Sequence, residues 1–305
     1  MAPNKPLRLP LAVAEVDRAA HLRSNESYLT SSWPTAQVLI FTDEKFATKD
    51  DQLFYESGAS LGQYQDQNDY FLGTKDSKAY FVRHLQSGEI AGLDFKTLRQ
   101  IGASLSPTDI GLAVHAQALA NWHKKHPRCS QCGSTTKVVL AGAVRRCEAD
   151  QSEHYPRTDG AIIVLVKDNQ NRILLGRQKV WPKNRFSTFA GFVEPGESFE
   201  NCLRREVMEE AGVDISEINY LGSQPWPFPA SLMIAFEALT TTPEKARPDG
   251  EEIEEIRWFT RAQMKSAIED KTLILPLEIS VARQMIKAWY GEGADTELVG
   301  NESWR

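Results

Sequence analysis

The chain has 305 residues, of which 41% are hydrophobic and 25% are charged, so it is an ordinary soluble globular protein that is too long for one average domain. No apolar run reaches the length of a membrane span and residues 1–24 lack the apolar core of a signal peptide, so we expect a cytoplasmic protein with no membrane partner. The net charge of -6 excludes a general electrostatic attraction to DNA, although a local basic patch can still hold a phosphate chain.

Residues 1–125 are predicted to form a small α+β domain. Short apolar runs bounded by polar residues predict strands at residues 36–42, 69–73 and 79–84. A helix is expected at residues 108–123, with Thr108 as its cap. We interpret His115 and His123 on this helix as packing or surface residues. The role of this domain, in packing, dimerisation or substrate access, stays open.

Residues 126–156 have the cysteine spacing of a zinc ribbon. Cys129 and Cys132 form one knuckle, and Cys147 begins a second. Tetrahedral zinc needs four ligands, and a fourth cysteine is absent from this segment. Three alternatives remain: a zinc site completed by His154 or a carboxylate, a weak site, or a ribbon without metal. The polar residues at the expected fourth position are Asp150, Ser152, Glu153 and His154.

Residues 157–305 are predicted to form one compact domain. A buried strand at residues 161–166 pairs with a second strand at residues 172–176 across a turn-rich tetrapeptide. Further strands are expected at residues 186–190, 231–239 and 252–259, and helices at residues 261–268 and 277–290. These elements predict a layered helix–sheet–helix body.

The most informative stretch is GFVEPGESFENCLRREVMEEAGV at residues 191–213. Ser198 is placed to cap a short helix, and Gly212 is placed to end it. Glu206, Glu209 and Glu210 are spaced by three and four residues and therefore share one helix face. Carboxylates so close together repel one another unless a cation lies between them, and oxygen ligands suit Mg²⁺ or Mn²⁺.

This stretch resembles the Nudix box at every fixed position. The match runs from Gly191 through Glu197 and the Arg205-Glu206-Val207 triplet to the Glu209-Glu210 pair and Gly212. The resemblance implies an α+β protein whose last domain is a Nudix α/β/α sandwich with a mixed sheet. The zinc-ribbon-like module and the α+β N-terminal domain precede it.

A second signature follows at residues 223–233, SQPWPFPASLM. Pro225, Pro227 and Pro229 prevent a helix and stiffen an extended backbone, which holds Trp226 and Phe228 in fixed positions. The alternative is a packed connection between strands. The stretch resembles the signature of the NADH pyrophosphatases, a Nudix group that hydrolyses NADH and, in members studied for it, removes NAD caps from RNA.

The resemblance implies roles for individual residues. Glu206, Glu209, Glu210 and Glu252 are expected to bind Mg²⁺ or Mn²⁺. Arg205 is expected to orient a box carboxylate through a bidentate pair. Phe192 is expected to stack on the nicotinamide. The other expected substrate contacts are Gln224, Ser231, Met233, Tyr155 and Ala282. Because family members complete their pockets across a dimer interface, a homodimer is expected.

The predicted reaction is attack of water on the pyrophosphate of NADH or NAD⁺, giving nicotinamide mononucleotide and AMP. Glu209 and Glu210 are the candidates for general base. Removal of NAD caps from RNA is a second reaction for the same site. The alternatives are a nucleotide-sensing regulator that binds without hydrolysis and a broad nucleoside-diphosphate pyrophosphatase. The intact box argues against the regulator.

Overall fold

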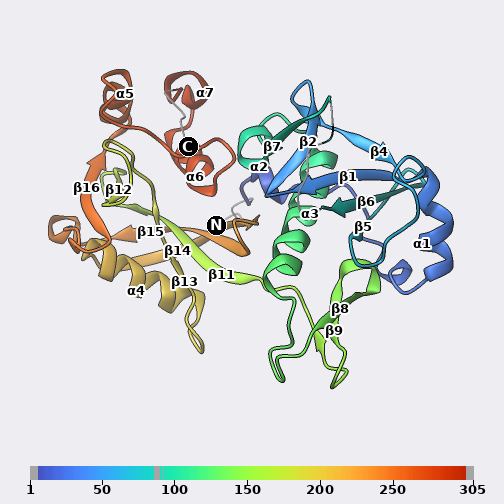
Figure 1. The fold of residues 1–305 in the computed structure, drawn as a ribbon. Helices are drawn as coiled ribbons and strands as arrows, with labels where there is room; N and C mark the ends of the chain where they lie inside the picture. Colours follow the sequence, from blue (N-terminus) through green and yellow to red (C-terminus); the bar gives the residue numbers. More distant parts are fainter. Residues whose placement is uncertain (1–5, 86–89, 91, 300–305) are drawn as a thin grey trace. The chain divides into compact units, whose positions relative to one another are not determined.

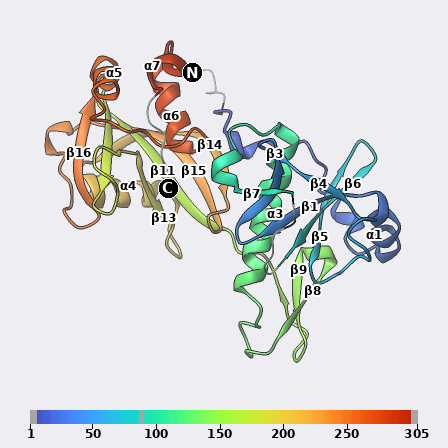
Figure 2. The ribbon, with the colours of Figure 1, turned by 45° about the horizontal axis from the view of Figure 1, so that its top comes forward.

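The computed structural model describes residues 6–85, 90 and 92–299. The chain divides into two compact units, which are described separately (Figure 1 and Figure 2). One contains Leu11–Thr158 and Pro225–Ala230, and the other contains Met1–Pro10, Asp159–Gln224 and Ser231–Arg305. Within the described part of the chain, no helix combines the length and apolar character that crossing a membrane requires.

The unit that begins at Leu11 is built on a seven-stranded sheet. The central strand, β1 (Gln37–Thr42), is apolar and almost fully buried. It pairs in parallel with β6 (Lys78–His84). The path of the sheet is β3-β2-β1-β6-β5, while β4 pairs with β1 and β7 pairs with β2. The strands are β1 (Gln37–Thr42), β2 (Lys45–Lys49), β3 (Gln52–Leu53), β4 (Tyr55–Ser57), β5 (Asp69–Lys75), β6 (Lys78–His84) and β7 (Asp94–Thr97).

Helices α1 (Glu26–Ser32), α2 (Leu98–Ile101) and α3 (Pro107–Lys125) belong to the same unit. The prediction that Thr108 caps the long helix was wrong. Ser106 is the cap, because its hydroxyl accepts the Asp109 N–H, and Pro107 follows it at the first helical position. Proline suits that position since its φ angle is already helical and no amide proton is needed there.

The ribbon strands β8 (Thr136–Val139), β9 (Val144–Cys147) and β10 (Glu153–His154) form an antiparallel sheet in the order β10-β9-β8. His123 of α3 joins the helix to this ribbon. Its Nδ1 lies 3.0 Å from an Arg145 nitrogen, and its Nε2 lies 2.9 Å from the Gly142 carbonyl oxygen. Burial lowers the pKa of His123 to about 3, so the interpretation as a packing residue is confirmed.

The other unit contains a six-stranded sheet along the path β14-β15-β11-β12-β16, with β13 paired to β11. Strand β11 runs parallel to β15 and antiparallel to β12 and β13, so the sheet is mixed as predicted. The strands are β11 (Asp159–Lys167), β12 (Ile173–Gln178), β13 (Phe189–Phe192), β14 (Ile215–Trp226), β15 (Ser231–Thr240) and β16 (Ile253–Phe259). The helices are α4 (Phe199–Ala211), α5 (Arg261–Glu269), α6 (Val281–Tyr290) and α7 (Ala294–Glu297).

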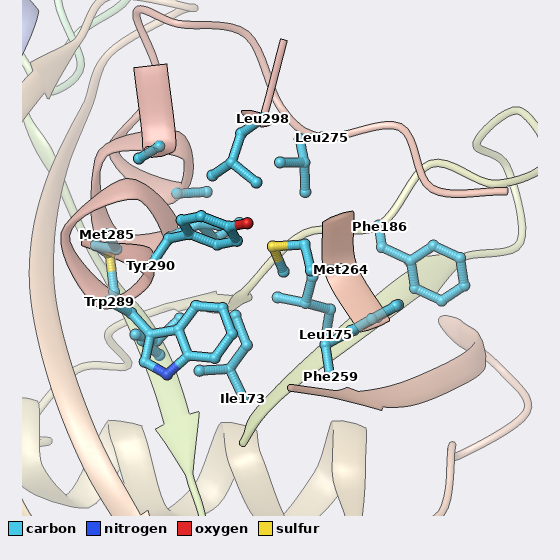
Figure 3. Packing of buried hydrophobic residues seen from close by; sticks show 14 of the residues in the cluster. Ile173, Leu175, Phe186, Phe259, Met264, Leu275, Met285, Trp289, Tyr290 and Leu298 are labelled. Carbon is cyan, nitrogen blue, oxygen red and sulfur yellow. The ribbon is translucent and has the colours of Figure 1, made fainter. Parts of the chain in front are cut away.

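Strand β11 shows why its sequence is a continuous apolar run. Side chains alternate between the two faces of a strand. Ile163 and Leu165 pack with residues of α5 and α6, such as Met264 and Trp289, in the cluster shown in Figure 3. Ile162, Val164 and Val166 pack in a second cluster with residues of α4. Both faces are covered, which confirms the predicted helix–sheet–helix body.

The largest differences from the predicted element boundaries occur at β13 and α6. Strand β13 begins at Phe189 and includes Gly191 and Phe192, whereas residues 186–190 were predicted. The last long helix begins at Val281 because the Ser280 hydroxyl accepts the Arg283 N–H, whereas the predicted helix began at residue 277. The pattern of apolar residues alone does not show where a strand or a helix begins.

Candidate active site

Helix α4 carries the box carboxylates and has both ends that the sequence predicted. The Ser198 hydroxyl accepts the Asn201 N–H at 3.2 Å. Gly212 ends the helix in the left-handed conformation, with φ 67°. Leu203 and Val207 are fully buried against the sheet. The opposite side of the helix is therefore free to present its glutamates.

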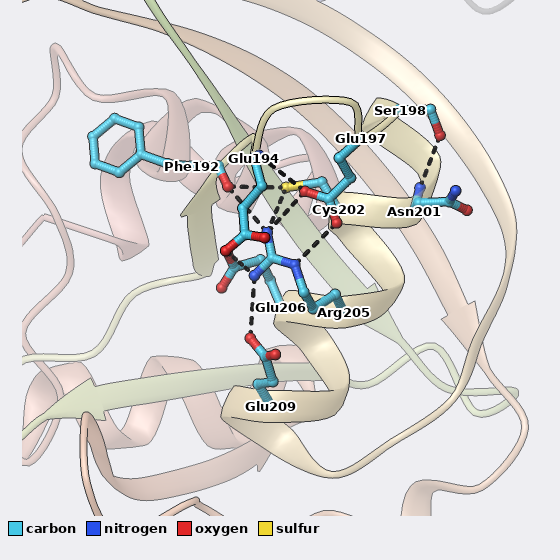
Figure 4. Close-up of polar contacts among 9 residues, drawn as sticks. All are labelled: Phe192, Glu194, Glu197, Ser198, Asn201, Cys202, Arg205, Glu206 and Glu209. Carbon is cyan, nitrogen blue, oxygen red and sulfur yellow. Dashed lines mark hydrogen bonds and ion pairs between the residues drawn. The ribbon is translucent and has the colours of Figure 1, made fainter.

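Arg205 is the centre of the polar network (Figure 4). Its Nε and one terminal nitrogen each lie 2.9 Å from a Glu197 oxygen, so the expected bidentate pair is present. Its other terminal nitrogen donates to Glu206 at 2.7 Å and to Glu209 at 3.1 Å. A further bond of 3.1 Å reaches the carbonyl oxygen of Phe192. One guanidinium therefore forms hydrogen bonds with residues of β13, of the box loop and of α4.

The electrostatic effect of this network is seen at Glu197. The bond from Arg205 lowers the pKa of Glu197 to about 2, helped by the backbone N–H of Glu194. The pKa of Arg205 is raised, chiefly by the same bond. The sequence pattern contains Glu197 but did not identify it as the arginine's partner. The position of Glu197 in the box, eight residues before Arg205, could have identified it as this partner.

Glu210 is the most unusual carboxylate of the site. It is 5% exposed, and one of its oxygens has no hydrogen-bond partner among the described residues. Burial, followed by the charges of Glu252, Glu206 and Asp249, raises the pKa of Glu210 to about 8. A buried oxygen without a donor, surrounded by like charges, is the environment that a bound cation relieves. The site is therefore suited to a divalent cation that prefers oxygen ligands.

Glu252 lies just before β16 and reaches this group from outside the box. Its carboxylate accepts a 2.6 Å bond from Gln178 of β12. The turn before it is held by Asp249, which accepts the backbone N–H groups of Glu251, Glu252 and Ile253. Neither Gln178 nor Asp249 was predicted, since the contacts join different strands and a loop.

Gly191 approaches Glu206 so closely that a larger residue would displace the Glu206 carboxylate. A Cβ atom on Gly191 would lie 1.9 Å from the carboxyl carbon of Glu206. The first glycine of the box is therefore needed for close packing of β13 against α4. This contact also fixes the position of the Glu206 carboxylate, whose pKa is raised by burial and lowered in part by Arg205.

Three predicted substrate contacts share one face of the sheet. Phe192 of β13 and Met233 of β15 both pair with Ala161 of β11, from opposite sides. Ser231 lies two residues before Met233 on β15 and pairs with Asp159 of β11. Direct cross-strand neighbours point to the same face. Phe192 is 59% exposed, as a stacking platform requires. The structure thus brings Phe192, Ser231 and Met233 together.

The other three predicted contacts lie elsewhere. Gln224 is fully buried and donates to the Ile279 carbonyl oxygen at 2.9 Å. Ala282 is buried in α6. Tyr155 is 65% exposed, belongs to the other compact unit and donates to Glu153. Their predicted roles in binding remain predictions.

The ribbon cysteines form a compact group with Asp150. The candidate ligand atoms of Cys129, Cys132, Cys147 and Asp150 all lie within 4.8 Å of one another, and no other such group of three or more occurs among the described residues. Cys132 Sγ is 3.5 Å from Cys147 Sγ, and Cys129 Sγ is 3.6 Å from Asp150 Oδ2. Tetrahedral zinc at the usual bond lengths places two sulfurs about 3.8 Å apart and a sulfur and an oxygen about 3.6 Å apart. The cluster therefore fits zinc, whereas His154 bonds to Ser152 instead.

The described geometry defines a class of protein. A carboxylate-rich helix is held by one arginine at the edge of a mixed sheet, and helices cover both faces of that sheet. In agreement, residues 156–276 match the NUDIX domain family, residues 124–155 match the NADH pyrophosphatase zinc ribbon domain, and residues 24–122 match the NADH pyrophosphatase-like rudimentary NUDIX domain.

Similar proteins narrow this class. The chain is 35% identical over 287 residues to the NAD-capped RNA hydrolase NudC of Mycobacterium bovis, a match that covers 90% of this chain and 92% of that protein. The Mycobacterium tuberculosis NudC is 34% identical with the same coverage. The human NAD-capped RNA hydrolase NUDT12 is 36% identical over 197 residues, or 61% of this chain and 42% of that protein. The chain belongs to the Nudix hydrolase family, in its NADH pyrophosphatase group.

Replacement of Gly191 by alanine tests the close contact with Glu206. The added methyl should displace that carboxylate and lower kcat by about 100-fold, because shifts of about 1 Å at a reacting site cost that much. Steady-state kinetics with NADH measures the effect. Gly160→Ala is the matched control, since its Cβ would lie 3.8 Å from the nearest atom. Equal kinetics for the two variants would contradict the prediction.

The raised pKa of Glu210 predicts how the metal-free protein responds to pH. The folded state holds this proton up to a pKa of about 8, whereas an unfolded glutamate loses it near 4.5. With EDTA present, the free energy of unfolding should therefore fall as pH rises between these values, by at most about 1.4 kcal/mol per unit. Urea unfolding measures this slope. Glu210→Gln should reduce it, and an unchanged slope in that variant would show that another group is responsible.

Proposed function

We propose that this protein hydrolyses the pyrophosphate bond of NADH and NAD⁺, giving nicotinamide mononucleotide, in its reduced form from NADH, and AMP. It also removes NAD caps from the 5′ ends of RNA. The observation that carries the proposal is the similarity over 92% of the length of a relative named as a NAD-capped RNA hydrolase. The intact carboxylate site supports it, because a protein that only senses nucleotides does not need the buried Glu210 with its unpaired oxygen.

The residues of this chain have separate tasks in the proposed reaction. Glu206, Glu209, Glu210 and Glu252 would hold Mg²⁺ or Mn²⁺, and the bound ion would lower the pKa of the attacking water and neutralise the phosphates. Arg205 orients Glu206 and Glu209 by donating a hydrogen bond to each carboxylate. Phe192 offers its exposed face to the nicotinamide, and Ser231 and Met233 line the same side of the sheet. Glu209 or Glu210 accepts the proton of the water.

Product identification tests this function. The protein is incubated with Mg²⁺ or Mn²⁺ and with NADH, NAD⁺, ADP-ribose or a short NAD-capped RNA, and the products are separated by mass. Nicotinamide mononucleotide from NADH and from the capped RNA supports the proposal. Equal cleavage of ADP-ribose would indicate a broad pyrophosphatase, and binding of NADH without any cleavage would indicate a regulator.

Glu209→Gln should lower kcat for NADH by at least about 100-fold, since it removes a metal ligand or the general base. The fold should persist because the Glu209 side chain is 58% exposed. Glu200→Gln is the control, as Glu200 lies on the exposed first turn of the same helix. Steady-state kinetics and circular dichroism measure both variants. Activity close to wild type in Glu209→Gln would overturn its assigned role.

We further propose that the ribbon binds one structural zinc ion through Cys129, Cys132, Cys147 and Asp150. Purified protein should contain about one zinc per chain, and Asp150→Ala should lose most of it because three ligands hold zinc less firmly. His154→Ala should keep its zinc. Metal analysis by mass spectrometry measures all three proteins. Full zinc in the Asp150 variant would exclude the carboxylate as the fourth ligand.

We also propose a homodimer, because the family group that the chain resembles completes its substrate pocket across such an interface. Light scattering after gel filtration should give twice the chain mass of 34.3 kDa. A monomer at assay concentrations that still hydrolyses NADH at full rate would contradict this proposal.

A further inference from the structure

A polar cavity lies beside the proline-rich stretch, within the unit that begins at Leu11. The cavity has a volume of about 310 Å³ and lies between α2, α3 and the segment Pro225–Ala230. Two buried amides of α3 hold this segment. Gln117 donates to the Pro227 carbonyl oxygen at 2.9 Å, and Asn121 donates to the same oxygen at 3.0 Å. Both amide side chains line the cavity.

Gln117 has a hydrogen-bonding atom left over. Its side chain is 1% exposed, and its Oε1 has no partner among the described residues. The amide cannot be turned around, because Oε1 would then face the Pro227 carbonyl oxygen. A buried acceptor without a donor costs about 1–3 kcal/mol. A small shift of the Gln117 side chain would let a ligand in the cavity donate an N–H or O–H group to this buried oxygen and recover that free energy.

Another part of the cavity lining is a cationic stacking surface. The guanidinium of Arg99 lies 4.4 Å from the ring centroid of Phe228 and 5.7 Å from that of Trp226. No hydrogen bond or ion pair joins Arg99 to any other described residue. Lys125, at the exposed end of α3, lines the same cavity. Glu44 also lines it, so two positive charges and one negative charge meet there.

This combination matches the chemistry of a single nucleotide. Arginine planes and aromatic rings stack on bases of single-stranded RNA, and basic side chains bind the phosphates. Every base carries an N–H donor for the Gln117 oxygen, so the site does not require a particular sequence. The volume suits a small ligand, since such pockets begin at about 300 Å³.

We propose that this cavity binds one nucleotide of the RNA chain that follows the NAD cap. The inference rests on the proposed function. The cavity segment Pro225–Ala230 lies in the sequence between Gln224 and Ser231, which are two of the predicted contacts to the cap. This connection within the protein chain favours the RNA behind the cap as the source of the nucleotide. With a net charge of -6 the whole chain does not attract RNA, so a local site of this kind is needed.

Two neighbouring lysines allow a matched test by kinetics. Lys125→Glu should raise the KM for a short NAD-capped RNA about tenfold and weaken its salt dependence, because one phosphate contact is lost. Its kinetics with NADH should not change. Lys124→Glu makes the same change of charge one residue away, on a side chain that lines a different cavity, and should leave both substrates nearly unaffected. Equal losses in the two variants, or a loss with NADH, would overturn the proposal.

A binding experiment separates this inference from the hydrolytic function. A fluorescent, uncapped, 5′-phosphorylated RNA oligonucleotide is titrated with the wild-type protein in EDTA, so that no turnover is needed. It should bind, and both Lys125→Glu and removal of the bases from the oligonucleotide should weaken binding by about tenfold. Equal affinity for the abasic oligonucleotide would overturn the site. If free AMP displaces the fluorescent RNA at the same concentration at which unlabelled RNA displaces it, the cavity binds a free nucleotide instead. Absence of hydrolysis with intact RNA binding would refute the enzymatic proposal alone.

Discussion

Mutual repulsion of carboxylates is the constraint on which this structure depends. Glu206, Glu209 and Glu210 occupy one side of α4, and Glu252 adds a fourth negative charge from the end of a loop. Arg205 offsets part of this repulsion through its bonds to Glu197, Glu206 and Glu209. Glu210 stays outside its reach and keeps a raised pKa. The imbalance leaves the fold prepared to bind a cation.

The rest of the Nudix unit fixes the positions of these carboxylates. Strand β11 is covered on both faces, so the edge strand β13 is attached to a rigid centre. Gly191 admits the Glu206 carboxylate where any side chain would collide with it. The next residue, Phe192, points to the other face and joins Ser231 and Met233 there. One short strand thus places the metal-binding helix and the substrate-facing side chains on its two sides.

The other compact unit has two roles that the sequence did not separate. It holds the ribbon, through His123 and Arg145, and it holds the proline-rich segment, through Gln117 and Asn121. The aromatic residues of that segment pack on one another and beneath Arg99. These contacts support the interpretation of the segment as a packed connection between strands, here β14 and β15.

The sequence by itself determined the family, the reacting helix and eight of the sixteen described strands. These features depend on local spacing: carboxylates three and four residues apart, a serine cap, a terminal glycine and alternating or continuous apolar runs. Local patterns failed at helix ends, as with Thr108 and Ser106, where two polar residues on either side of Pro107 compete for the cap. The partners of Glu252 and Gln117 were decided only by tertiary structure. Such contacts join residues distant in the chain, and their energies depend on burial and geometry that spacing does not encode. The same reason explains why the sequence did not distinguish Asp150 from Ser152, Glu153 and His154 as the residue beside the three cysteines.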